Sequence, residues 1–242
     1  MVISMSWRNN FLFIAHRGAS ALEPENTLAA FKRALSMGAD AIELDVRRSK
    51  DGVLVVLHDE DLKRVAGVDR KVWELTIEEL KRIKVFGKEF IPTLEEVLAE
   101  FGNKIPLFIE IKDEGIESKV VEYLNLYKVY DNTLVISFNY NVLLKIKEIL
   151  SKVDVGLITY RYPLPVDEAQ KLKALAILPR YNLVSPRAIS IAKSKNLKVY
   201  TWTINDVSTA LKVINYGVDG IATDNPALKN EVRKQQKLVR YF

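Results

Sequence analysis

The sequence predicts a parallel (β/α)₈ barrel, the TIM-barrel architecture of the α/β class, and two observations indicate it. Eight short apolar runs typical of buried strands alternate with eight segments of helical periodicity along the 242 residues. No linker rich in Pro, Gly or Ser interrupts this alternation, so we expect residues 1–242 to form a single domain. In such barrels the functional groups lie at the carboxyl ends of the strands. An open, doubly wound sheet is the alternative, because periodicity does not establish closure.

The first predicted strand leads into three residues that suit a functional site. Residues 11–14 form an apolar run, and His16, Arg17 and Gly18 follow after a single alanine. A helix is expected over 24–38, because proline marks its start and glycine its end.

Two predicted strands carry charged residues at the same spacing. Residues 41–46 alternate strictly between apolar and polar side chains, and the strand predicted at 106–112 repeats the two-residue spacing of the charged residues. Because the large apolar side chains would face the helices, the charged ones would point into the barrel, where isolated carboxylates are costly. These charged residues are Glu43 and Asp45 on the first strand, and Glu110 and Lys112 on the second.

A hairpin is expected after the second strand. The pair Asp51-Gly52 suits a two-residue type I′ turn, and the apolar run 53–57 follows it. With this loop, Asp45 falls directly opposite His58, and the two side chains share one face of the sheet.

Residues 59–90 interrupt the simple alternation. They are polar, and one short helix is indicated at 76–80, where Thr76 and Glu79 form a capping-box pattern. We expect a small insertion after the second strand that folds over one end of the barrel, either as a lid or substrate rim or as surface structure.

From residue 93 onward the alternation of strand and helix returns. Strands are expected at 106–112, 133–137, 153–159, 175–178, 198–203 and 220–223, and helices at 93–101, 116–128, 140–150, 166–173, 186–195, 206–216 and 226–237.

The composition excludes several classes of protein. Without cysteine there is no disulfide framework, thiolate nucleophile or Cys-ligated zinc, and no apolar run is long enough to span a membrane. The net charge of +5 comes from basic residues mixed with acidic ones, which favours a solvated surface over a nucleic-acid site. We therefore expect a cytoplasmic protein with a small phosphate-bearing substrate, no nucleic-acid partner and no stable membrane insertion; no oligomeric state is implied.

Three inward carboxylates and one lysine leave a net negative charge that a divalent cation would balance. Oxygen ligands favour Mg²⁺, Ca²⁺ or Mn²⁺ over zinc. Glu43, Asp45 and Glu110 are therefore the expected ligands of one such cation, and a structural ion-pair network without metal is the alternative.

The two histidines of the chain, His16 and His58, each follow a predicted strand and together suggest a pair that transfers protons near neutral pH. Arg17 offers a planar fork for phosphate oxygens, and a surface salt bridge is its alternative role. Trp202 lies near the end of a strand and forms either a wall of the substrate cleft or part of the core. No G-x-S-x-G, P-loop, G-x-G-x-x-G or His-rich zinc motif is present.

Motifs along nearly the whole chain resemble those of the glycerophosphodiester phosphodiesterase family. The first half carries His16-Arg17-Gly18, Pro24-Glu25-Asn26-Thr27, Glu43-Leu44-Asp45-Val46, Lys50-Asp51-Gly52 and His58-Asp59. The second half carries Thr76 to Leu80, Pro92-Thr93-Leu94, Glu110-Ile111-Lys112, Ser137-Phe138, Trp202-Thr203-Ile204-Asn205 and Asp219-Gly220-Ile221-Ala222-Thr223-Asp224. The resemblance implies a (β/α)₈ enzyme that hydrolyses glycerophosphodiesters to glycerol 3-phosphate and an alcohol.

The resemblance also implies roles for the residues above: a catalytic pair of His16 and His58, metal ligands Glu43, Asp45 and Glu110, phosphate contacts Arg17 and Lys112, and a head-group wall at Trp202. We expect one histidine, His16, to act as base and the other, His58, as acid, with water or the substrate's own 2-hydroxyl as nucleophile. Where the family commonly has Arg-Thr-Thr this chain has Arg64-Val65-Ala66, which affects substrate preference rather than chemistry. The alternatives are a lysophospholipase D or phospholipase C-like phosphodiesterase and, last, a non-enzymatic phospholipid- or nucleic-acid-binding protein.

Overall fold

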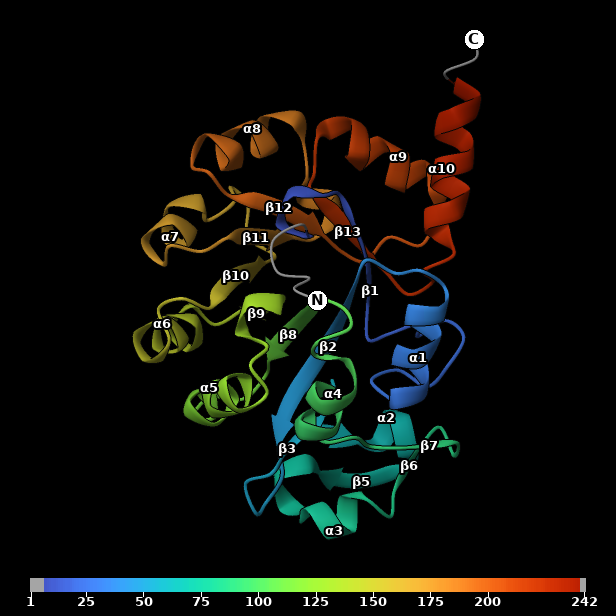
Figure 1. Ribbon diagram of the computed structural model, residues 1–242, viewed down its shortest axis with the longest axis vertical. Coiled ribbons are helices and arrows are strands. Elements are labelled where there is room, and N and C mark those ends of the chain that lie inside the picture. Colours follow the sequence, from blue (N-terminus) through green and yellow to red (C-terminus); the bar gives the residue numbers. More distant parts are fainter. Residues whose placement is uncertain (1–6, 240–242) are drawn as a thin grey trace.

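Parallel strands close into a barrel in the computed structural model, which describes residues 7–239 (Figure 1). The barrel strands, in their order around it, are β1 (Leu12–Ala15), β2 (Ala41–Arg48), β8 (Leu107–Ile111), β9 (Thr133–Ser137), β10 (Asp154–Thr159), β11 (Ala176–Pro179), β12 (Lys198–Thr201) and β13 (Gly220–Thr223). Strand β1 pairs with β13 on one side and with β2 on the other, and this second pairing closes the sheet. The (β/α)₈ prediction is confirmed, and the open-sheet alternative is wrong.

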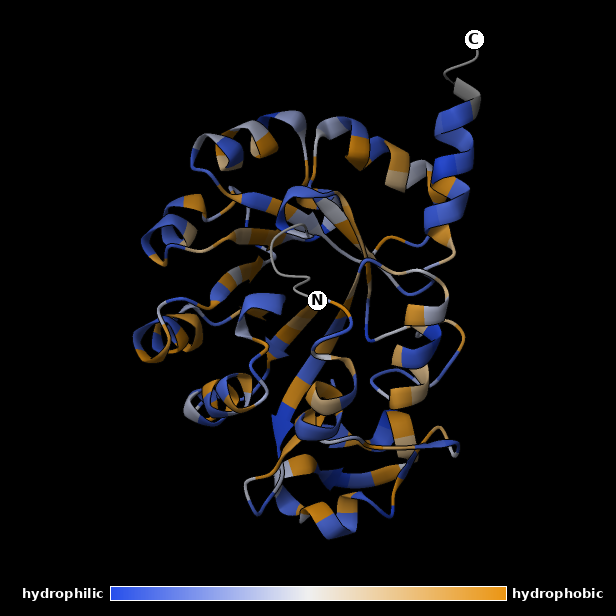
Figure 2. Ribbon diagram, in the orientation of Figure 1, coloured by the Kyte–Doolittle hydropathy of each residue, from blue (hydrophilic) through white to orange (hydrophobic). Residues whose placement is uncertain are grey.

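Helices follow the barrel strands and surround them (Figure 1). They are α1 (Leu28–Ser36), α4 (Leu94–Phe101), α5 (Glu117–Leu126), α6 (Tyr140–Ile149), α7 (Val166–Lys171), α8 (Pro186–Ser194), α9 (Val207–Tyr216) and α10 (Leu228–Val239). Figure 2 shows hydrophobic and hydrophilic residues interleaved along these helices, as expected when one face packs on the strands and the other meets water. Within residues 7–239, none of the helices combines the length and apolar character needed to cross a bilayer.

Alternation along the strands separates an outer apolar layer from the barrel interior. On β2, Ile42, Leu44 and Val46 pack in the outer layer with the surrounding helices, while Glu43 and Asp45 are also buried but belong to no apolar cluster. The interior layer below them is a separate apolar cluster that includes Ile14, Phe108, Ile136, Leu178 and Tyr200. The charged groups of β2 therefore lie next to an apolar layer inside the barrel.

Helix starts follow the capping residues in the sequence. Helix α1 begins at Leu28, a few residues later than the proline suggested, because the Thr27 side chain caps it by accepting a hydrogen bond from Ala30 N. The capping box expected between Thr76 and Glu79 is present at α3 (Ile77–Leu80).

The segment between β2 and α4 forms the expected insertion. It contains β3 (Leu54–Val56), β4 (Asp61–Leu62), α2 (Lys63–Ala66), β5 (Val68–Lys71), α3, β6 (Lys84–Val85) and β7 (Glu89–Phe90), and it lies beyond the end toward which the β2 arrow points (Figure 1). Its own apolar cluster includes Val55, Leu57, Leu62 and Leu80. The two-residue strands of its small sheets are too short to show alternation, which is why the sequence indicated only the helix.

The hairpin register predicted from Asp51-Gly52 is wrong by one residue. Strand β2 pairs antiparallel with β3 so that Val46 lies opposite Val56, and Leu57 N donates to the carbonyl oxygen of Asp45. The loop has three residues rather than two and ends at Gly52 in the left-handed region, with φ +81°. This longer loop moves every residue of the returning strand by one position.

Candidate active site

A cavity of about 230 Å³ opens among residues at the carboxyl ends of the barrel strands. Seven of the eight predicted site residues line it: His16, Arg17, Glu43, His58, Glu110, Lys112 and Trp202. The eighth, Asp45, is only 1% exposed and lies behind them, in contact with Lys112 and Arg17. Residues from five separate stretches of the chain thus meet at one cleft.

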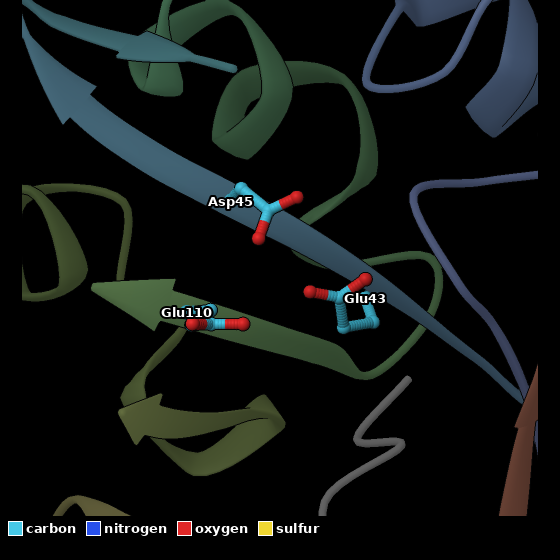
Figure 3. A group of neighbouring side chains, drawn as sticks. All are labelled: Glu43, Asp45 and Glu110. Carbon is cyan, nitrogen blue, oxygen red and sulfur yellow. The ribbon is translucent and has the colours of Figure 1, made fainter. Parts of the chain in front are cut away.

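The three predicted carboxylates converge. Glu43 and Asp45 project from β2 toward the space that Glu110 enters from the neighbouring strand β8 (Figure 3), and Asp45 pairs in register with Glu110. One oxygen from each group lies within 4.8 Å of the others, and all three residues are buried.

Burial and mutual repulsion make two of these carboxyl groups hard to ionise. The pKa of Glu43 is raised well above its ordinary value by burial and then by the charges of Asp45 and Glu110. The same causes, burial first and then Asp45, raise the pKa of Glu110 to about 7. Oxygen ligands at this spacing and an excess of buried negative charge fit a divalent cation such as Mg²⁺, Ca²⁺ or Mn²⁺.

Two basic residues balance part of this charge. Lys112 Nζ lies 3.0 Å from Asp45 Oδ1 and 2.6 Å from Glu110 Oε1, and Arg17 Nε lies 3.3 Å from Asp45 Oδ2. Burial raises the pKa of Asp45, but the charges of Lys112 and Arg17 outweigh burial and hold that pKa below its usual range. The lysine thus pairs with Asp45 and Glu110 and the arginine side chain with Asp45, so an ion-pair network without metal leaves Glu43 poorly compensated.

The turn after β1 points a backbone N–H toward the carboxylate cluster. Arg17 has φ +55°, and its backbone N–H donates to Glu43 Oε2 at 2.9 Å. Gly18 also has positive φ, and a Cβ there would lie 2.7 Å from atoms of Ala30 on α1. Only glycine fits this close approach between the turn and the helix.

His16 is held by a carboxylate from the opposite end of the chain. Its Nδ1 lies 2.7 Å from Asp224 Oδ1, to which Ser20 Oγ also donates, while Asn205 Nδ2 donates to Asp224 Oδ2 at 2.6 Å. Burial raises the pKa of Asp224, but the hydrogen bonds from His16, Asn205 and Ser20 outweigh it and lower that pKa to about 2. An ionised Asp224 keeps the ring proton on Nδ1 and leaves Nε2 to exchange protons.

His58 reaches the cleft although the register prediction failed. Strand β3 ends at Val56, and beyond it the chain turns so that His58 lines the cavity beside Glu43. Arg47 Nε donates to the His58 carbonyl at 2.9 Å, and His58 Nδ1 lies 2.7 Å from Asp59 Oδ1. Burial lowers the pKa of His58, and the charge of Asp45 opposes that effect only in part. Both histidines therefore carry an aspartate on the same ring nitrogen.

Several supporting residues were absent from the predicted site. Asn26 Nδ2 donates to Asp45 Oδ2 at 2.8 Å, and Asp59 and Asp224 hold the histidines. Asp59 adjoins His58 in sequence, and all three occur in the motifs quoted above, which was the available signal. Their roles depend on side-chain orientation, which those motifs do not specify.

Aromatic rings form the other wall of the cleft. Trp202 packs edge-on against Phe138 and Tyr160, with ring centroids 5.8 and 5.2 Å away, and its Nε1 donates to the Leu178 carbonyl at 2.9 Å. Phe138 and Tyr160 stack on each other at 4.9 Å and are 40% and 59% exposed. Trp202 combines both roles considered for it, because it lines the cleft and also packs against the interior apolar cluster.

Comparison with known proteins gives a consistent result. Residues 16–228 match the profile described as "Glycerophosphoryl diester phosphodiesterase family". A glycerophosphodiester phosphodiesterase of Caldanaerobacter subterraneus subsp. tengcongensis is 39% identical over 239 residues, covering 92% of this chain and 98% of that relative.

Solved structures show the same similarity. An Oleispira antarctica phosphodiesterase in complex with the product sn-glycerol-3-phosphate is 30% identical, with a TM-score of 0.84 over 94% of this chain and 98% of that one. A glycerophosphodiester phosphodiesterase of Thermotoga maritima is 31% identical, with a TM-score of 0.79 over 92% and 98% of the two chains.

Proposed function

Because this chain belongs to the glycerophosphoryl diester phosphodiesterase family and is a glycerophosphodiester phosphodiesterase, we propose that it hydrolyses its substrates to sn-glycerol 3-phosphate and an alcohol with a divalent cation and a histidine pair. One observation carries the proposal: two aspartate-bound histidines line one cleft with Glu43 and Glu110, and the buried carboxylate of Asp45 converges with those two. The Oleispira antarctica relative, whose bound product is sn-glycerol-3-phosphate, supports the choice of product.

Glu43, Asp45 and Glu110 would hold the cation. When bound, it would supply positive charge that stabilises the phosphoryl oxygens as negative charge builds on them. Asn26 donates a hydrogen bond to Asp45, and the Arg17 backbone N–H donates one to Glu43. Such hydrogen bonds fix the orientation of carboxylates that bind a metal ion.

The two histidines would divide the proton transfers. His16 takes the proton from the attacking oxygen, which belongs to water or to the substrate's 2-hydroxyl, and His58 gives one to the departing alkoxide. In the second case a cyclic phosphate forms, and water then opens it to the same product. Each aspartate keeps the imidazole in one orientation and stabilises the imidazolium form.

Arg17 and Lys112 would bind the phosphate directly. The Arg17 guanidinium has five N–H groups, of which Nη1 donates to Glu25 and Nε lies beside Asp45. Lys112 Nζ has three protons and contacts two carboxylates. The remaining donors of both groups are available for phosphate oxygens, and Trp202 would contact the alcohol portion of the substrate. A cytoplasmic location belongs to the same proposal.

A lysophospholipase D-type activity is the second candidate. It is favoured by Trp73, Phe86 and Phe90 of the insertion, which are 44%, 47% and 50% exposed and could contact an acyl chain.

Product identification across a panel of diesters tests both candidates. We expect turnover of glycerophosphodiesters, loss of activity in excess chelator and recovery with added Mg²⁺, Ca²⁺ or Mn²⁺. Full turnover of glycerophosphocholine in chelator would remove the cation from the proposal. Turnover of lysophosphatidylcholine alone would favour the second candidate, and no turnover of any diester would overturn both.

A further inference from the structure

Arg64 links the insertion to the active-site cleft. It lies on α2, the short helix of the insertion, and its side chain is 46% exposed. Its guanidinium donates to both oxygens of Glu25, at 2.8 and 2.7 Å, and to Asp59 Oδ2 at 2.6 Å. The bidentate pairing with Glu25 fixes the plane of that carboxylate, and the third hydrogen bond fixes Asp59 beside it.

Each of these carboxylates holds a site residue with its other contacts. Glu25 Oε1 also accepts from Arg17 Nη1 at 2.9 Å, and Asp59 Oδ1 lies 2.7 Å from His58 Nδ1. One guanidinium therefore lies a single carboxylate away from the phosphate-binding arginine and from the proposed general acid. Arg17 and His58 come from different loops, and Arg64 binds the two carboxylates that contact them, Glu25 and Asp59.

Other arginines of the insertion lack such contacts. Arg70 pairs with Glu74 and Arg82 with Glu78, each four residues apart and on exposed surface. Surface pairs of this kind contribute little to stability, because solvent screens them and both side chains remain mobile. Glu25, by contrast, is only 14% exposed at its side chain, so its orientation depends on the partners that surround it.

We propose that Arg64 is a positioning residue for the reaction, which orients Arg17 through Glu25 and His58 through Asp59. The insertion then contributes to the geometry of the cleft as well as covering the barrel end. This inference rests on the proposed function, because it takes His58 as the acid that protonates the leaving group.

A comparison of leaving groups tests the inference. Glycerophosphocholine releases an alkoxide that needs a proton, whereas a nitrophenyl ester of glycerol 3-phosphate releases a phenolate that does not. We expect Arg64→Ala to lower kcat/KM for glycerophosphocholine at least about tenfold, because small displacements of catalytic groups are costly, and to affect the nitrophenyl ester less. Arg64→Lys keeps the charge without the fork and should recover only part of the loss.

A double-mutant cycle separates positioning from general stability. If Arg64 acts through Asp59, then Arg64→Ala should cost much less in an Asp59→Asn background than in the wild type. Arg70→Ala is the matched control, with an unchanged leaving-group ratio and activity. Equal losses on both substrates, full additivity with Asp59→Asn, or the same activity as the control would each overturn the inference. A wild type that cleaves neither diester would refute the proposed function instead, so the two failures are distinguishable.

Discussion

The replacement Glu110→Gln tests the electrostatics of the carboxylate cluster in the cation-free protein. Glutamine keeps the volume of the side chain and can still accept a hydrogen bond from Lys112, so it resembles the protonated form of Glu110. The variant therefore removes one negative charge from a buried site with little change in packing.

The expected magnitude follows from the pKa of Glu110. A rise from the ordinary 4.5 to about 7 corresponds to about 3 kcal/mol, at roughly 1.4 kcal/mol per pKa unit. Because the folded protein holds this proton up to a higher pH than the unfolded chain, stability is full below pH 4.5 and falls as the pH rises toward 7 and beyond. This group alone makes the cation-free wild type less stable at pH 8 than at pH 4.5.

Thermal unfolding followed by circular dichroism in chelator, at pH 5 and pH 8, measures the effect. From pH 5 to pH 8, the free energy of unfolding of the glutamine variant should rise by up to about 3 kcal/mol relative to that of the wild type. For a chain of this size, this is a Tm difference of about 5–10 °C. Glu122→Gln, at an exposed position, is the matched control and should show no such gain.

Added cation should narrow this difference in stability at pH 8. Saturating Mg²⁺ stabilises the wild type by about 2.7 kcal/mol at 100 times its Kd, and the variant, which lacks one ligand, should gain less. The reasoning is refuted if the variant follows the same pH dependence as the wild type in chelator, or if Mg²⁺ stabilises both equally.

Three further outcomes are expected. Replacing His16 or His58 by alanine should lower the rate at least about a hundredfold with little change in Tm; a rate near that of the wild type would exclude a general acid–base role for that residue. Asp224→Asn should lower kcat and should also reduce the loss of stability toward urea as the pH falls from about 4 to about 2. A pKa of about 2 in place of 3.8 contributes stability above pH 3.8 that is lost as the pH falls toward 2, and asparagine removes this contribution. The same dependence of stability on pH over this range as in the wild type would contradict the ion pair with His16. Trp202→Ala should change the relative kcat/KM values among alcohol groups while Mg²⁺ stabilises the protein as before, and equal losses for every alcohol would assign it to packing alone.

Local sequence patterns determined most of the architecture. Strict alternation at 41–46 placed Glu43 and Asp45 on one face, and the structure buries both away from the outer apolar layer. The capping box at Thr76 and Glu79 is present where the pattern indicated it. Such patterns depend on a few neighbouring residues, so they can be recognised without knowing which strands pair.

Tertiary contacts decided the loop length and the strand register, which a local pattern does not determine. A three-residue loop replaced the two-residue turn, because the same Asp-Gly pair fits either loop and the pairing of β2 with β3 selects one. His58 nevertheless lines the cleft, since the chain leaves the strand before it.

The sequence by itself thus determined the strand and helix order, the inward carboxylates and the two histidines at strand ends. Only the folded chain decided how these groups are held, because their supports are distant in sequence: Asp224 lies 208 residues from His16, and Arg64 lies 39 residues from Glu25. Side-chain hydrogen bonds extend over about 3 Å and depend on orientation, so only closure of the barrel and folding of the insertion bring such partners within reach.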